Sequence, residues 1–600
     1  MISRVARIYV FVAFTAISAS AQIASTETQA CNPKMAQMLV EQQVAESKSV
    51  TARPKRIKIL LRSADFLWPL DQPTARAYFI EAFTNAKEHF AEKGFEKANV
   101  QKSQNGGSST YTTLPDLRSD VIRAVSTRDP ELAKKFADEV LAEFEKTVDR
   151  DVMNKTREQD DLLGLAGESA ATNPDFARYL YRRLMRSPLT QSWFWSLNTA
   201  ARRNQPLADS IYAEALRNYR NEKPGSLLNL SAYPFGFESN FGQGRSFTAA
   251  PNSSFVPNVA LQRSFLDTFF ARVESFTGNP EELNAPVDQY SQPEATSMVT
   301  ALRDMEPLII ERFPDMLQRF SVARSQANAA LTAEQRKNIE DQEKSVARSS
   351  RTFEEWIKEL EEADGKGRLT DFMIAQILFQ RRMRTDEHYA KYEPWLAKIK
   401  EEKPRGEITN YYWFVRTQLA IREKRFADAE KMAAKVIELD HRSILLLDLA
   451  KVQLDSTNDA GSGFEVINGV SKLARTAPNS VAKAKVLFSL VGFYERINHS
   501  LALDELGEAV RVVNQLEEPD IFQPWVYRQI AGKGFAFMAS ISLPGNDLEG
   551  MFTAMGKKDF EMSLANARSF NDKYFRTISV IAIAKNCVAV KPPANAKPKK

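Results

Sequence analysis

The stretch Asp71-Gln72-Pro73-Thr74-Ala75 has the features of a helix start, and similar starts recur in the first third of the chain. In each, a Pro follows Asp, Asn or Gln, and an Ala lies within the first turn. Pro is tolerated at the first helical position because its missing N–H has no partner there, and a polar residue before it can cap the helix. The other copies are Asp129-Pro130 with Ala133, Asn173-Pro174 with Ala177, and Gln205-Pro206-Leu207-Ala208.

The recurring helix start predicts a helical-repeat protein. Apolar residues follow each start one and two turns on, as Phe136 and Val140 do in the second copy. A helix with one apolar stripe buries it only against a neighbour, so we expect antiparallel helix pairs stacked into an all-α solenoid. Glycine is scarce at 23 of 600 residues, which favours helix throughout. The spacing between the Pro residues varies, so the solenoid should be irregular.

The helical pattern divides the chain into two arrays with a charged region between them. Thr332-Ala333-Glu334-Gln335 has the spacing of a capping box and begins a strongly charged stretch with few apolar residues. The predicted division is a signal peptide over 1–21, an N-terminal segment over 22–51, a first array over 52–274, a linker and charged helix over 275–365, a second array over 366–588 and a disordered basic tail over 589–600.

An aromatic-rich stretch interrupts the first array between 221 and 257, where we expect a loop rather than a helix. The candidate ligand-binding residues in it are Tyr233, Phe235, Phe237 and Arg245. Two interpretations remain open. Either the loop folds back and plugs its own superhelix, or these side chains face a ligand.

The first residues are typical of a secretory signal. Arg4 and Arg7 precede an apolar stretch over 8–17, and Ala19-Ser20-Ala21 is a small-residue cleavage site. The apolar run is shorter than the roughly 20 residues that a membrane-spanning helix needs. We therefore expect a chain that is exported to the periplasm or the extracellular space, begins at Gln22 after cleavage and has no integral membrane segment.

The chain has two cysteines, Cys31 and Cys587, near the two ends of the mature protein. An oxidising compartment permits a disulfide between them. Alternatively, Cys587 is simply a core residue, since it continues the apolar stripe of a predicted helix. A bridge would require either a superhelix curved into a near-closed ring or an N-terminal segment that reaches across, because bridged Cα atoms lie about 5–6 Å apart.

The second array resembles the tetratricopeptide repeat family. Trp413, Phe426, Ala429, Leu439 and Asp440 fall at the spacing of that repeat. The resemblance implies a right-handed superhelix of helix pairs with a concave surface for a partner, and it implies no reaction. Departures from the pattern are Arg416, Thr417, Ala420 and His441, and a weaker copy consists of Phe493, Ala502, Leu506 and Ala509.

No residue pattern points to a particular reaction. The chain has no G-x-S-x-G, no phosphate-binding glycine loop and no H-E-x-x-H, and its four histidines are scattered, so we expect neither a protein-bound metal nor a cofactor. The formal charge is +5 without a basic face of interleaved aromatics, which argues against nucleic-acid binding. The sequence thus favours an exported, non-catalytic helical-repeat protein that binds a protein or peptide. The alternative is a glycan-binding or glycan-cleaving all-helical protein.

Overall fold

The structure is a computed structural model. It describes residues 31–94, 97–98, 112–113, 116–146, 152–235, 258–276, 280–284, 293–349, 351–380, 382–455 and 460–588 of the chain. The predicted signal peptide and basic tail lie outside these residues. None of the helices in these ranges combines the length and the hydropathy of a membrane span.

The first part of the chain forms paired helices. They are α1 (Pro33–Ser47), α2 (Arg53–Leu67), α3 (Gln72–Lys93), α4 (Leu117–Ser126), α5 (Pro130–Lys146), α6 (Val152–Ser169), α7 (Pro174–Leu184) and α8 (Ser192–Asn218), with a short strand pair, β1 (Lys97–Ala98) and β2 (Thr112–Thr113), between α3 and α4. The predicted N-terminal segment over 22–51 therefore contains a helix of the array.

The predicted helix starts form through side-chain caps. Asp71 Oδ1 accepts a hydrogen bond from Thr74 N at 3.2 Å, and Asn173 Oδ1 accepts one from Phe176 N at 3.1 Å. The fourth start differs from expectation, because the cap is Asn204 rather than Gln205. Asn204 interrupts α8 with φ −157° and ψ 80°, and its Oδ1 accepts from Leu207 N at 3.2 Å.

The middle of the chain continues the helices without a break in the architecture. It contains α9 (Pro224–Phe235), α10 (Val259–Phe276), α11 (Pro280–Asn284), α12 (Glu294–Arg312), the 3-10 turn η2 (Pro314–Met316), α13 (Leu317–Ala329), α14 (Ala333–Ser349) and α15 (Phe353–Gly365). The predicted capping box is present at the start of α14. There Thr332 N donates to Gln335 Oε1 at 2.9 Å, and Gln335 N donates to Thr332 Oγ1 at 3.2 Å.

The expected loop over 221–257 is wrong for its first part, because residues 224–235 form α9. This helix is buried on all sides, so its sequence has no polar stripe to reveal a helical period. Two prolines and a glycine within α9 also have low helix propensity, which weakens the sequence signal of a helix. Residues 236–257 lie outside the described part of the chain.

The last part of the chain forms further helix pairs and one β-hairpin. It contains α16 (Asp371–Phe379), α17 (Asp386–Leu396), α18 (Glu402–Arg422), α19 (Phe426–Ala433), α20 (Leu439–Leu454), α21 (Ala460–Thr476), α22 (Val481–Glu495), α23 (His499–Val513), β3 (Trp525–Gly532), β4 (Phe535–Ser542), α24 (Leu548–Lys558), α25 (Phe560–Arg568), α26 (Lys573–Ala584) and the 3-10 turn η3 (Lys585–Cys587). The hairpin corrects the expectation of helices alone over 366–588.

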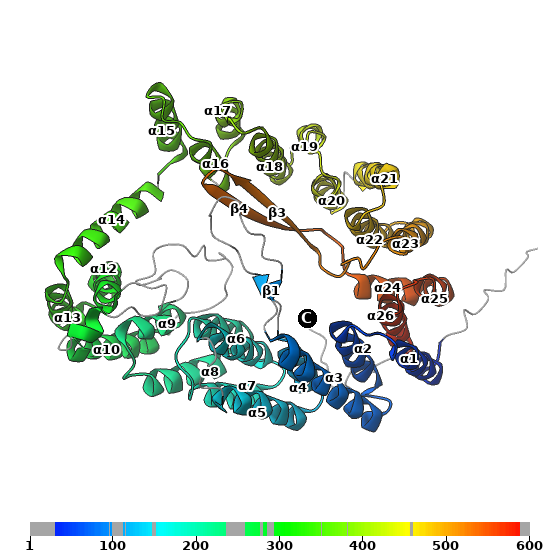
Figure 1. Ribbon diagram of the computed structural model, residues 1–600, viewed down its shortest axis with the longest axis horizontal. Helices are drawn as coiled ribbons and strands as arrows, with labels where there is room; N and C mark the ends of the chain where they lie inside the picture. Colours follow the sequence, from blue (N-terminus) through cyan, green and yellow to red (C-terminus); the bar gives the residue numbers. More distant parts are fainter. Residues whose placement is uncertain are drawn as a thin grey trace, which may run out of the picture.

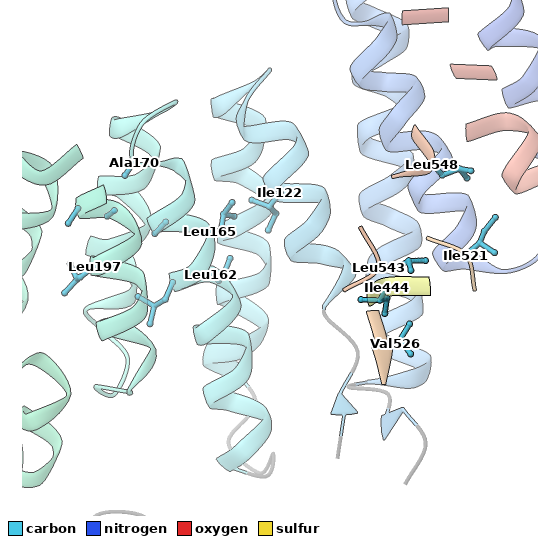
Figure 2. Close-up of a cluster of buried hydrophobic side chains, with 14 of the residues drawn as sticks. Ile122, Leu162, Leu165, Ala170, Leu197, Ile444, Ile521, Val526, Leu543 and Leu548 are labelled. Atoms are coloured by element: carbon cyan, nitrogen blue, oxygen red, sulfur yellow. The ribbon is translucent and has the colours of Figure 1, made fainter. Parts of the chain in front are cut away.

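The helix pairs follow one another around a circle that closes on itself (Figure 1). Helices α18, α20 and α22 line the inside of the circle, and α19, α21 and α23 lie outside them (Figure 1). At the closure, α1 and α2 pack against α26. The buried apolar residues form one continuous core along the whole circle, of which Figure 2 draws a part. The all-α solenoid is therefore confirmed, and it is bent into a ring.

Candidate functional site: a hairpin inside the ring

The hairpin of β3 and β4 lies inside the circle of helices (Figure 1). Its strands pair antiparallel from Trp525↔Ser542 to Gly532↔Phe535 without a bulge. The two-residue turn between them ends at Gly534, whose φ of 83° lies in the left-handed region that glycine adopts without steric cost. Successive side chains of a strand point to opposite faces, so the hairpin has two distinct faces.

One face of the hairpin packs on the inner helices through stacked aromatic rings. Phe537 of β4 stacks on Phe379 of α16, with ring centroids 4.0 Å apart and planes 7° apart. Phe379 in turn stacks on Tyr411 of α18 at 5.0 Å. Ile530 and Val526 of β3 are buried on the same face. Figure 2 shows Val526 and Leu543 in the part of the core that contains Ile444 of α20. This packing fixes the hairpin to helices α16 and α18.

Polar contacts fasten the hairpin at its middle, tip and base. Arg528 Nη2 lies 2.9 Å from Glu438 Oε1, next to the start of α20. At the tip, Lys533 N donates to Glu401 Oε1 at 3.2 Å. At the base, Lys485 Nζ of α22 donates to the carbonyl of Trp525 at 3.4 Å. The hairpin is therefore held along its length and spans α16 to α22.

Two ionisable residues near the base of the hairpin, Lys485 and Asp440, have shifted pKa values. Burial lowers the pKa of Lys485, although the charges of Asp520 and Asp440 oppose the shift. Burial alone would raise the pKa of Asp440, but hydrogen bonding and charge from His441 lower it below its ordinary value. The Lys485 ammonium donates to the carbonyl of Trp525 and Asp440 contacts the ring of His441 at 2.9 Å, so each group has a partner in the local fold.

The other face of the hairpin exposes large apolar side chains. Trp525 is 43% exposed, Tyr527 62% and Met538 50%, and all three lie on the face away from the aromatic stack. Their neighbours on this face include Ala536, Ser540 and Ser542, which are small and uncharged. Aromatic and methionine side chains are enriched in protein interfaces, where they supply contact area. We call this face, defined by Trp525, Tyr527 and Met538, the open face.

Two of the four candidate ligand residues from the sequence, Tyr233 and Phe235, lie in the core. Tyr233 is fully buried in α9, where its hydroxyl donates to Asp209 Oδ1 at 2.7 Å, and Phe235 is 2% exposed against Phe265. These two rings are core residues because α9 is covered on every side. Phe237 and Arg245 lie outside the described residues.

A disulfide joins Cys31 to Cys587, with Cα atoms 5.2 Å apart. It lies where α1 packs against α26 and η3, so the bridge and the curvature into a ring occur together. Lys55 Nζ also pairs with Asp572 at 3.1 Å, and Arg62 Nε pairs with Glu549 at 2.8 Å. We call these contacts of α1 and α2 with α24, α26 and η3 the seam.

Metal-binding groups and the acidic pair of α6 are the features of the described residues that bear on catalytic chemistry. No group of His, Cys, Asp and Glu side chains there is arranged to hold a metal ion. The acidic pair Asp160-Asp161 lies inside α6, well after the start of this helix at Val152. Burial, with the charge of Asp116, raises the pKa of Asp161 to about 6. Asp160 accepts a hydrogen bond from Thr190 at 3.0 Å and serves the local packing.

Sequence reasoning missed Trp525, Tyr527 and Met538. A signal was available, because apolar residues alternate on both sides of Gly532-Lys533-Gly534, a pattern typical of a β-hairpin. Surrounded by helical sequence, these residues were assigned to the second array. The alternation explains both the buried aromatic stack and the open face.

Comparison with known proteins adds little to this description. No protein-family model matches the chain, and no curated protein is similar to it. One solved structure, described as a "circular tandem repeat protein with novel repeat topology and enhanced subunit contact surfaces", is similar at 14% identity over 80% of this chain and 84% of the other, with a TM-score of 0.15. A TM-score this low carries no argument, so the assignment as a helical-repeat protein rests on the helices themselves.

Proposed function

We propose that this protein is an exported, non-catalytic scaffold of tetratricopeptide-like helix pairs that binds a protein or peptide partner on the open face of its inner hairpin. The observation that carries the proposal is the exposure of Trp525, Tyr527 and Met538 on a hairpin that is itself firmly held. A rigid support keeps the entropic cost of binding low, because the contact residues are ordered before the partner arrives.

Export is supported by the basic and apolar start of the sequence together with the Cys31–Cys587 disulfide. Disulfides form and persist in oxidising compartments and are rare in the cytosol. A partner in the periplasm or outside the cell would meet the ring there. Intact-mass analysis of the exported protein checks this part, with a mass that begins at Gln22 as the expected result. A mass that retains Met1 would contradict it.

The test of binding is a displayed peptide library screened against the immobilised full-length protein, in parallel with a glycan array. We compare the parent with the triple variant Trp525→Ala, Tyr527→Ala and Met538→Ala. The matched control replaces three comparably exposed apolar residues away from the hairpin, Ile80→Ala, Ile310→Ala and Val322→Ala.

Peptides that bind the parent and the control, but not the hairpin variant, would support the proposal. Binding of glycans alone, lost in the hairpin variant, would replace the peptide with a sugar ligand, since exposed aromatic rings also stack on sugars. Retention of all binding by the hairpin variant would overturn the assignment of the open face.

A further inference from the structure

The unpaired edge of β4 suggests how a partner is held, an inference that rests on the proposed function. The sheet has only two strands, β3 and β4, within the described part of the chain, so each strand has one outer edge. An outer edge presents a row of backbone N–H and C=O groups that fit another extended chain.

The hydrogen-bond register identifies which backbone groups point outward. Leu543 N donates to the carbonyl of Pro524 at 2.8 Å, so these two residues form a hydrogen-bonded pair. Such pairs alternate with non-hydrogen-bonded pairs along an antiparallel ladder. Ser542, Ser540, Met538 and Ala536 therefore belong to non-bonded pairs, and their backbone groups point away from β3.

These outward groups of β4 form no hydrogen bond to any described residue, whereas one outward group of β3 is already used. Trp525 belongs to a non-bonded pair by the same alternation, and its carbonyl accepts from Lys485. In addition, β3 packs beside α18. As far as the structure describes the chain, the free edge is thus the edge of β4.

Features that normally protect an edge strand are missing from β4. Natural proteins place charged residues, proline or bulges on such edges to prevent pairing with other chains. The strand reads Phe-Ala-Phe-Met-Ala-Ser-Ile-Ser over 535–542, with no charge and no proline, and its register has no bulge. An edge of eight unprotected residues is suited to pairing.

Both faces beside the β4 edge offer apolar contacts to an added strand. On the open face, Met538 is half exposed. On the opposite face, Phe372 of α16 is 40% exposed, with its ring 6.2 Å from Phe535 and 6.4 Å from Phe537. Alternate side chains of an added strand would contact these two residues from opposite faces. Both Met538 and Phe372 are apolar, so they favour uncharged side chains in the added strand.

We infer that the partner is an extended peptide segment with apolar residues on both faces, which adds to the hairpin as a third strand along β4. The hairpin lies within the circle of helices (Figure 1), and its β4 edge offers unpaired backbone groups between two apolar contacts, which an extended peptide matches. A second copy of this chain fits less well, because its own hairpin is enclosed in the same way. An extended segment supplies the backbone hydrogen-bond partners that the outward groups of β4 lack.

The test uses the full-length protein and the tightest eight-residue peptide from the displayed library. The peptide is made unmodified, N-methylated at its odd residues and N-methylated at its even residues. In an added strand, only alternate N–H groups face the protein, so one methylated form should bind at least about tenfold more weakly and the other should bind as before. Equal binding of the two methylated forms would overturn strand addition while leaving the proposed function in place.

Two matched proline variants test the edge from the side of the protein. Ser540→Pro removes an outward N–H from β4, and Gln529→Pro removes one from β3 at a comparable place in the ladder. We expect the first to weaken peptide binding at least about tenfold and the second to leave it unchanged. Equal losses in both variants would overturn the assignment to β4. A library that yields no binding peptide refutes the proposed function itself, and a concentration-dependent dimer abolished by Ser540→Pro would identify a second copy as the occupant instead.

Discussion

Removing the Cys31–Cys587 disulfide should loosen the seam and leave the rest of the ring unchanged. The bridge joins residues 556 positions apart, for which the chain-entropy relation gives about 6 kcal/mol. This figure is an upper bound, because measured contributions of disulfides are typically about 2–4 kcal/mol. The change is made by Cys31→Ala with Cys587→Ala, and independently by reduction of the parent.

The seam retains other contacts when the bridge is absent, so we expect opening rather than unfolding. Lys55–Asp572 at 3.1 Å and Arg62–Glu549 at 2.8 Å are partly exposed ion pairs, each contributing about 0–1 kcal/mol. The apolar packing of α1 and α2 on α26 also remains. A loss of about 2–4 kcal/mol corresponds to roughly 30- to 1,000-fold more frequent opening, since about 1.4 kcal/mol is a factor of ten.

Amide hydrogen exchange followed by mass spectrometry measures this opening segment by segment. Peptides that cover α1 (33–47) and α26 (573–584) should exchange faster in the double variant and in the reduced parent. Peptides that cover α16 to α18 are the internal control and should not change. Reductant should have no further effect on the double variant. The reasoning is refuted if exchange at α1 and α26 stays unchanged, or if the acceleration spreads evenly around the ring.

Three further predictions concern buried and half-buried residues. Ala429→Trp should lower stability by about 1–3 kcal/mol or more through overpacking where α19 meets α18, and a melting temperature equal to the parent's would contradict the helix register. Tyr233→Phe should cost about 1 kcal/mol through the lost hydrogen bond to Asp209, and Tyr233→Ala about 3–5 kcal/mol, as denaturant titration would measure. Asp161, with its pKa raised from 3.8 to about 6, favours the folded state below pH 4 and loses that contribution as the pH rises through 6. Asp161→Asn should therefore raise the melting temperature at pH 7 to 8 but not at pH 4; an equal effect at both would contradict the assignment.

Local signals in the sequence were sufficient to predict the helix starts. A cap such as Asp71 or Asn173 needs only residues three positions away, so its effect can be recognised without knowledge of the fold. The capping box of Thr332 with Gln335 is another such case. The cap at Asn204 shows the limit of this reasoning. The pattern assigned the cap to Gln205, which directly precedes Pro206, although Asn204 one position earlier is the better cap.

Features that depend on distant parts of the chain could not be predicted in the same way. Helix α9 is covered on all sides, and burial on all sides removes the amphipathic period by which helices are recognised. Tyr233 and Phe235 therefore resembled loop aromatics that seek a ligand, although they are core residues. Closure of the ring depends on small rotations that accumulate over many helix pairs, and no single repeat specifies their sum.

The two ends of the helical array cover each other, whereas the outer edge of β4 is left uncovered by the described residues. An open solenoid exposes the apolar sides of its first and last repeats and needs capping repeats to cover them. Here α1 and α2 cover α26, so the two ends of the array protect each other. The edge of β4 has no such cover among the described residues, and it carries neither charge nor proline. Because the helices surround the hairpin, two folded molecules have difficulty in bringing such edges together (Figure 1). An edge that would promote aggregation on an outer surface is thus compatible with a stable protein inside the ring, and it stays available to an extended peptide.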